Sequence, residues 1–143
     1  MEDNYRYIPY RGVNPVKRLY DEKHLLEKAY DFLNVVIRGN TLFAKGYCQP
    51  SEHSTVYEYK LMFTPGIRPM VFTTQPQIAY NNDIHMYSRD GSLCLFYPKD
   101  QSFTHLSHLF NTIIPWTHEW YLYYELYLLK GKWLHPYVDH RRI

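Results

Sequence analysis

The spacing of apolar residues changes at Gly39-Asn40, and this change constrains the fold more than any other feature of the sequence. Before it, apolar residues recur at helical intervals: Leu19, Leu25, Leu26, Ala29, Phe32 and Leu33. After it, residues 54–63 alternate between apolar and polar side chains, which is typical of a half-buried strand. In a chain of 143 residues, a helical segment followed by strands predicts one α+β domain over residues 1–143.

We expect the first helix to begin at Asn14-Pro15 and to run to about Val35, because Asn caps helices and Pro suits their first turn. Three strands are expected to follow, with short turns between them, at Thr41–Ala44 (ending near Cys48), Ser54–Phe63 and Met70–Thr74. Successive strands joined by short turns predict an antiparallel meander of three to four strands.

Residues 78–99 lack a regular period and contain Asp90-Gly91, a pair that favours a tight turn. Long irregular segments in small domains are often functional. Beyond this segment, Thr104 is a potential cap for a short helix through Phe110, and a second helix is expected from Pro115 to Gly131.

Composition narrows the function classes. The net charge of +2 is too small to indicate nucleic-acid binding, and no apolar run approaches the length of a membrane span. The residues Met1–Asn4 are polar and acidic, unlike the start of a signal peptide. We therefore expect a cytoplasmic protein with no membrane or nucleic-acid partner, in which Cys48 and Cys94 remain reduced.

Cys94 is the candidate reactive group, because it follows Gly91 by three residues within the irregular segment. A thiol exchanges acyl groups readily, and the neighbouring Arg89 and Asp90 are placed to influence its ionisation. The alternative is an inert, buried cysteine beside Leu93 and Leu95. Cys48 has no such context and is interpreted as structural.

Two segments, Gly66–Thr73 with its Pro69 and His85–Leu95, resemble the ubiquitin-conjugating-enzyme (UBC) family. In that family a proline-led third strand and a histidine upstream of the active cysteine stand at these places. The resemblance implies a UBC-like fold, with an N-terminal helix, an antiparallel meander, a cysteine-bearing loop and C-terminal helices. It also implies that Cys94 forms a thioester.

Within that family, the chain is more similar to prokaryotic members from CBASS antiphage operons. The similarity lies in Pro115–Trp120, Tyr124–Leu126 and Gly131–Trp133. It implies that Cys94 accepts the C-terminal carboxyl group of a partner, a cGAS-like nucleotidyltransferase. The sequence has no glycine-rich nucleotide loop and no cofactor motif, so activation of that carboxyl group would require a separate enzyme. The alternative is that the partner and this domain form a stable complex without turnover.

The sequence departs from the family in the triplet His85-Met86-Tyr87, which replaces histidine-proline-asparagine, and at Phe103-Thr104, which replaces a tryptophan. The resemblance implies catalytic roles for His85, as a base or as an orienting group, and for Tyr87, Asn82 or Asn81, as hydrogen-bond donors to an oxyanion. The alternative for His85 is a hydrogen bond to backbone within the loop. We expect Cys94 to be at least partly exposed in a shallow groove, with His85 and one of these donors nearby.

Four other interpretations remain open. A metal site would use the cluster His105, His108, His118 and His135, and a cysteine hydrolase would pair Cys94 with His85. A non-catalytic binding module would use the tyrosine-rich surface and the helix that carries Trp116 and Trp120. The basic end, with Lys130, Lys132, His140, Arg141 and Arg142, is a weaker candidate for nucleic-acid binding.

Overall fold

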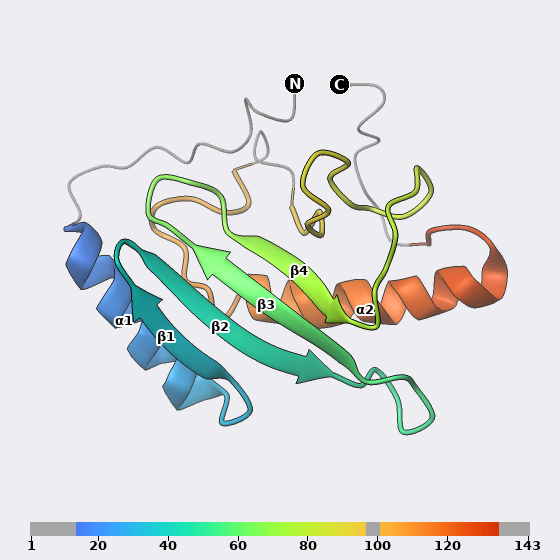
Figure 1. Cartoon of the computed structure of the whole chain (residues 1–143), viewed down its shortest axis with the longest axis horizontal. Helices are drawn as coiled ribbons and strands as arrows, with labels where there is room; N and C mark the ends of the chain where they lie inside the picture. Colours follow the sequence, from blue (N-terminus) through green and yellow to red (C-terminus); the bar gives the residue numbers. More distant parts are fainter. Residues whose placement is uncertain (1–13, 97–100, 135–143) are drawn as a thin grey trace.

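A computed structural model describes residues 14–96 and 101–134 (Figure 1). A four-stranded antiparallel sheet has the order β1-β2-β3-β4, as expected for a meander. One helix precedes the sheet and one follows it within these residues. The elements are α1 (Pro15–Ala29), β1 (Asn34–Arg38), β2 (Thr41–Cys48), β3 (Tyr57–Phe63), β4 (Met70–Gln75) and α2 (Ile113–Lys130).

Helix α1 begins as predicted, because the Asn14 side chain accepts the backbone N–H groups of Val16 at 2.9 Å and Lys17 at 3.2 Å. The prediction that it continues to Val35 was wrong. The backbone becomes extended at Tyr30, with φ −138° and ψ 109°, and residues 34–38 form β1. The β-branched run Val35-Val36-Ile37 favours a strand, and its apolar spacing had extended the helical pattern by coincidence.

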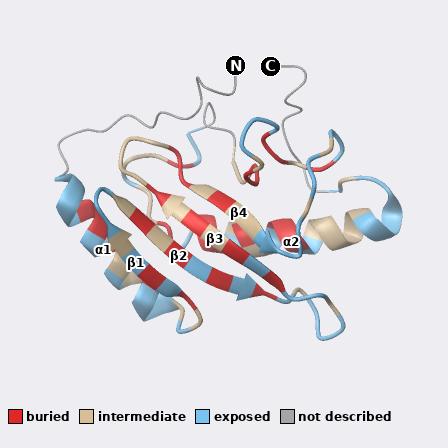
Figure 2. Cartoon of the chain, in the orientation of Figure 1, coloured by how far each residue is buried: buried red, intermediate tan, exposed pale blue. Residues whose placement is uncertain are grey.

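Gly39-Asn40 forms the two-residue turn between β1 and β2, with Gly39 at φ +61°. Strand β3 follows the predicted alternation, since it buries every second side chain from Tyr57 to Phe63 (Figure 2). This strand starts three residues later than expected. Ser51 and Ser54 hydrogen-bond to each other instead and close a turn before it.

Helix α2 lies behind the sheet in Figure 1 and packs on its inner face. Three polar contacts join them: Tyr59 hydroxyl to His118 Nε2 at 2.8 Å, Thr73 Oγ1 to Tyr121 hydroxyl at 2.7 Å, and Tyr57 hydroxyl to a carboxylate oxygen of Glu125 at 3.0 Å. The rings of Tyr57 and Tyr121 also stack with centroids 4.6 Å apart. Many of the chain's tyrosines therefore belong to its core. The helix ends at Gly131, as predicted, where φ is +77°.

Residues 104–110 form turns, so the prediction of a short helix there was wrong. The buried carboxylate of Glu22 in α1 accepts the backbone N–H of Leu109 at 2.7 Å, and Arg18 donates to the carbonyl oxygen of Ser107 at 2.5 Å. The Leu109 N–H would be paired internally in a helix through Phe110, and here it donates to Glu22 instead. Across the described ranges, neither helix combines the length and apolarity needed to cross a membrane.

Candidate functional site

Residues 86–93 form a small hairpin that leads directly into Cys94. Met86 pairs with Leu93, the Tyr87 N–H donates to Ser92 O at 2.9 Å, and the Gly91 N–H donates to Tyr87 O at 2.9 Å. Gly91 has φ +76°, a conformation that favours glycine. The Leu93 N–H donates to Val71 O at 2.9 Å, so the hairpin is attached to the edge of β4.

The buried side chain of Arg68 packs against the hairpin and hydrogen-bonds to it. Its side chain is 3% exposed, and its guanidinium carbon lies 3.9 Å from the centroid of the Tyr87 ring. The same group donates to Asp90 Oδ2 and to Ser92 Oγ, each at 3.1 Å. Asp90 also accepts the backbone N–H of Ser92 at 2.9 Å and its hydroxyl at 2.6 Å. The conformation of the chain before Cys94 therefore depends on a cation 26 residues upstream.

Sequence reasoning missed this role of Arg68. The residue was noticed only as part of the proline-led segment before β4. Its partner Asp90 was considered as part of the Asp90-Gly91 turn and for its effect on the thiol. The sequence does contain the opposite charges of Arg68 and Asp90, but they are 22 residues apart, and no local spacing indicates that they form a pair.

Cys94 is 3% exposed, so the expectation of a partly exposed thiol was wrong in this structure. Its Sγ–H points at the carbonyl oxygen of Phe96, 3.7 Å away, and its backbone N–H donates to His85 O at 3.0 Å. The burial follows from the attachments on both sides: Leu93 is bonded to β4, and His85 is bonded to α2 through Trp120 Nε1 at 2.7 Å. These bonds draw residue 94 against the body of the fold.

Three of the four predicted site residues are connected. The His85 carbonyl accepts the Cys94 N–H, and the Tyr87 hydroxyl donates to Phe96 O at 3.4 Å, the acceptor that the thiol also approaches. Tyr87 is buried, whereas the His85 side chain is half-buried. Asn82 is exposed, and its Oδ1 accepts the hydroxyl of Tyr80 at 2.7 Å.

Neighbouring Asn81 has a structural part in the same segment. Its Oδ1 accepts the backbone N–H groups of Asp83 at 2.8 Å and Ile84 at 3.2 Å. These bonds shape the turn that leads into Ile84, which is buried, and then into His85.

Residues 22–141 match the family model described as Type II CBASS E2 protein. The chain belongs to this family. A search of curated proteins returned no significant match.

The match confirms the resemblance to CBASS E2-like proteins and supports an E2-like role in CBASS, with partners from the same system. The family's E2 designation indicates a conjugating-enzyme-like activity. Two helices and a four-stranded antiparallel sheet, as seen in the described residues of this CBASS E2 protein, are compatible with an E2-like fold.

The second cysteine of this CBASS E2 protein, Cys48, lies buried at the end of β2. Burial, and secondarily the charge of Glu125, raise the pKa of the Cys48 thiol to about 11. The thiolate form is therefore scarce at neutral pH. This environment agrees with the structural role expected for Cys48.

The histidines considered as a metal site are dispersed among other partners. His108 Nδ1 lies 2.7 Å from a carboxylate oxygen of Glu22, and His118 contacts Tyr59 in the core, where burial lowers the pKa of His118. Among the residues the structure describes, no three His, Cys, Asp or Glu side chains are grouped as metal ligands. His135, His140, Arg141 and Arg142 lie outside the described residues.

Proposed function

We propose that Cys94 of this CBASS E2 protein accepts the C-terminal carboxyl group of a partner protein as a thioester during antiphage defence. The proposed partner is a cGAS-like nucleotidyltransferase. The observation that carries the proposal is the family match over residues 22–141, which includes Cys94 and the hairpin held by Arg68. Cys94 follows directly on a well-braced hairpin, so the backbone that carries the thiol is held in place, and a positioned nucleophile favours acyl transfer once the sulfur is accessible.

The reaction requires a separate activating enzyme that already carries the partner's C-terminus as a thioester. The Cys94 thiol gives up its proton and its thiolate attacks the carbonyl carbon to form a new C–S bond. The C–S bond to the cysteine of the activating enzyme breaks, and the departing thiolate takes up a proton. In the proposal, Tyr87 donates a hydrogen bond to the developing oxyanion, with Asn82 as a further donor. His85 orients the segment through its carbonyl oxygen, which accepts the Cys94 N–H.

Access to the sulfur is part of the proposal, because Cys94 is buried in the structure. The thiol must leave the Phe96 carbonyl and turn outward before it can attack. We propose that docking of the partner's terminus accompanies this local opening. A buried thiol that opens only on docking would also be protected from unproductive oxidation.

The experiment uses the full chain, produced together with the neighbouring nucleotidyltransferase and activating enzyme. Intact-mass spectrometry should detect an adduct that thiol reagents release and that maps to Cys94. The Cys94→Ala variant should lose the adduct, Cys94→Ser should give a thiol-resistant ester or none, and Cys48→Ala should retain it. Removing the partner's last residues should abolish the link. Persistence of the link in Cys94→Ala would reject the proposal.

One observation favours a second candidate, a non-catalytic binding module. Cys94 is buried, whereas several leucines in and after the second half of α2 are exposed: Leu122, Leu128, Leu129 and Leu134. Exposed apolar side chains that form a continuous patch are typical of contact surfaces. A module would keep its full antiphage activity in the Cys94→Ala variant, whereas an acyl carrier would lose it.

A further inference from the structure

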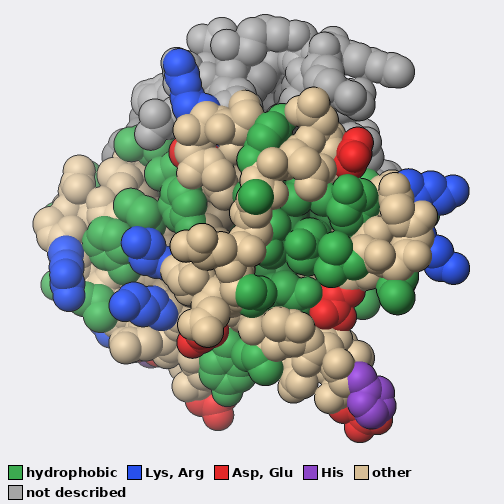
Figure 3. All heavy atoms as spheres, turned by 45° about the vertical axis from the view of Figure 1, so that its right-hand side comes forward, with side chains coloured by type: hydrophobic (Ala, Val, Ile, Leu, Met, Phe, Trp, Pro, Cys, Tyr) green, Lys and Arg blue, Asp and Glu red, His purple; other side chains and the backbone are tan. Residues whose placement is uncertain are grey.

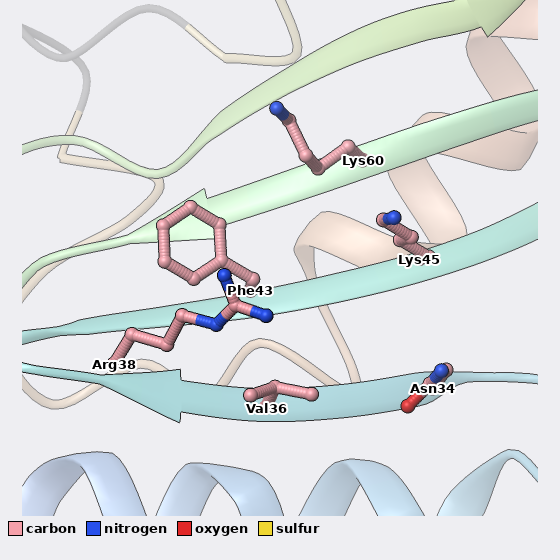
Figure 4. Close-up of a pocket in the computed structure, with 6 residues that line it drawn as sticks. All are labelled: Asn34, Val36, Arg38, Phe43, Lys45 and Lys60. Atoms are coloured by element: carbon pink, nitrogen blue, oxygen red, sulfur yellow. The ribbon is translucent and has the colours of Figure 1, made fainter.

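The outer face of the sheet, opposite α2, carries a groove that is not part of the Cys94 site. Its walls are made by β1, β2 and β3, and it encloses about 300 Å³ (Figure 4). The groove is lined by Asn34, Val36, Arg38, Phe43, Lys45 and Lys60.

Positive charge dominates this groove, since three of its six lining residues are cations and none is acidic. Lys45 and Lys60 are direct cross-strand partners on the outer face. Like charges in that arrangement repel each other, so the fold accepts a small loss of stability here. In Figure 3, Lys and Arg side chains lie beside hydrophobic side chains at the left of the view, and others lie at its right edge and top.

No carboxylate in the described part of the chain forms an ion pair with Arg38, Lys45 or Lys60. The acidic residue nearest in sequence on this face is Glu58, two positions before Lys60 on β3. An external anion would therefore supply charge neutralisation that residues 14–96 and 101–134 do not.

An apolar row separates the cations. Val36 pairs with Phe43, and Phe43 pairs with Met62, in one line across three strands. Val36 is 39% exposed, and Phe43 is half-buried. Lys45 and Lys60 lie on one side of this row, and Arg38, paired with Thr41, lies on the other. Because Thr41 and Lys45 are four residues apart on β2, the backbone positions that carry the two sets of cations are separated by about 13–14 Å. The Arg38 side chain extends from its position towards Phe43, so its guanidinium lies closer to the lysines than its backbone does (Figure 4).

We propose that this groove binds an acidic segment of a partner protein in an extended conformation. The segment would carry two carboxylates four residues apart, with an apolar side chain midway between them. One carboxylate would meet Lys45 and Lys60, the apolar side chain would lie on Val36 and Phe43, and the other carboxylate would meet Arg38. The spacing follows from the rise of an extended chain, which matches that of the strands beneath it.

A protein segment fits this surface better than a nucleic acid does. Nucleic-acid grooves continue as basic tracks with several aromatic platforms, whereas here the cations number three and surround a single ring in the groove. The apolar row between the charges has no counterpart in a phosphate backbone. Carboxylates on either side of an apolar residue in one extended segment can meet the lysines and Arg38 together.

Binding is tested with the full chain and a fluorescein-labelled peptide centred on Glu-Thr-Leu-Thr-Glu, followed by fluorescence anisotropy at low salt. A peptide of the same composition with its two glutamates adjacent serves as the ligand control. The charge reversal Lys45→Glu with Lys60→Glu should weaken binding about tenfold or more, and Arg38→Glu and Phe43→Ala should each weaken it severalfold. Lys28→Glu on α1 is the matched control and should bind like the wild type.

A single variant, Lys60→Glu, separates loss of binding from loss of folding. It replaces the repulsive pair of Lys45 and Lys60 with an attractive one, so it should not destabilise the sheet. Its thermal midpoint should equal or exceed that of the wild type, while its affinity for the peptide falls. The proposal is overturned if the charge-reversed groove binds as well as the wild type or if the control peptide binds equally. Preferential binding of a single-stranded oligonucleotide, competing with the peptide, would also overturn it.

Discussion

His118 contributes a pH-dependent term to stability. Its Nε2 contacts the Tyr59 hydroxyl within the core, and burial holds the pKa of His118 below its usual value of 6.5. Below that pH the unfolded chain takes up a proton that the folded chain resists. The free energy of unfolding should therefore fall as the pH decreases from about 6.5 towards the folded-state pKa, and this loss should stop below it.

Urea unfolding at pH 7.5 and pH 5.5 measures this effect. His118→Gln should show a smaller loss of stability on acidification than the wild type, by up to about 1.4 kcal/mol for each pH unit within the window. His53→Gln, in an exposed turn, is the control and should follow the wild type. Equal acid sensitivity in His118→Gln and the wild type would contradict the assignment.

At the scale of elements, α1 and the segment before α2 depend on one buried carboxylate. Glu22 accepts the Leu109 N–H, lies 2.7 Å from His108 and lies 3.5 Å from the buried guanidinium of Arg18. We expect Glu22→Gln to destabilise the fold by about 3–5 kcal/mol, because it leaves Arg18 without a counter-charge.

Chemical denaturation is the measurement for Glu22→Gln. The adjacent Asp21→Asn removes an exposed ion pair with Lys17 and should cost at most about 1 kcal/mol. If the two variants were equally stable, the buried carboxylate would not be what joins these segments.

The hairpin before Cys94 depends on Arg68 in the same way. Arg68→Lys loses the stacking on Tyr87 and the paired contacts with Asp90 and Ser92, because an ammonium group cannot reproduce the planar fork. We expect a loss of about 1–3 kcal/mol and faster amide hydrogen exchange at Ser92 and Cys94. Arg38→Lys, on the open face of the sheet, should leave both quantities unchanged. Unaltered exchange at Cys94 in Arg68→Lys would show that the hairpin holds its shape by other means.

At the scale of the whole molecule, Trp120 joins α2 to the hairpin through the His85 carbonyl, and the same carbonyl holds the Cys94 backbone. Trp120→Phe should cost about 1 kcal/mol or more and should increase the rate at which iodoacetamide labels Cys94. Cys48 is an internal control, since its raised pKa and burial should keep it slow in both proteins. An unchanged Cys94 rate would show that α2 does not govern access to the thiol.

Local signals predicted much of this architecture. The cap at Asn14, the alternation of β3 and the glycine stop at Gly131 depend on neighbours in sequence, and each was found. The end of α1 was not found, because residues 33–37 satisfy helical and strand spacing equally well. Two features were not predicted: the burial of Cys94 and the pairing of Arg68 with Asp90. Both depend on contacts between segments far apart in sequence, which the spacing of residues along the chain cannot predict.

The tyrosine contacts between α2 and the sheet determine where the helix can rest. His118, Tyr121 and Glu125 lie along one face of α2, and each meets a hydroxyl from β3 or β4. An interface of aliphatic side chains alone would specify the position of the helix by shape only, without hydrogen-bond partners that a slide of one helical turn, about 5.4 Å, would separate. Here such a slide would leave three hydroxyl groups without their partners. The three polar contacts can form together in only one alignment of helix and sheet, so they fix where α2 packs.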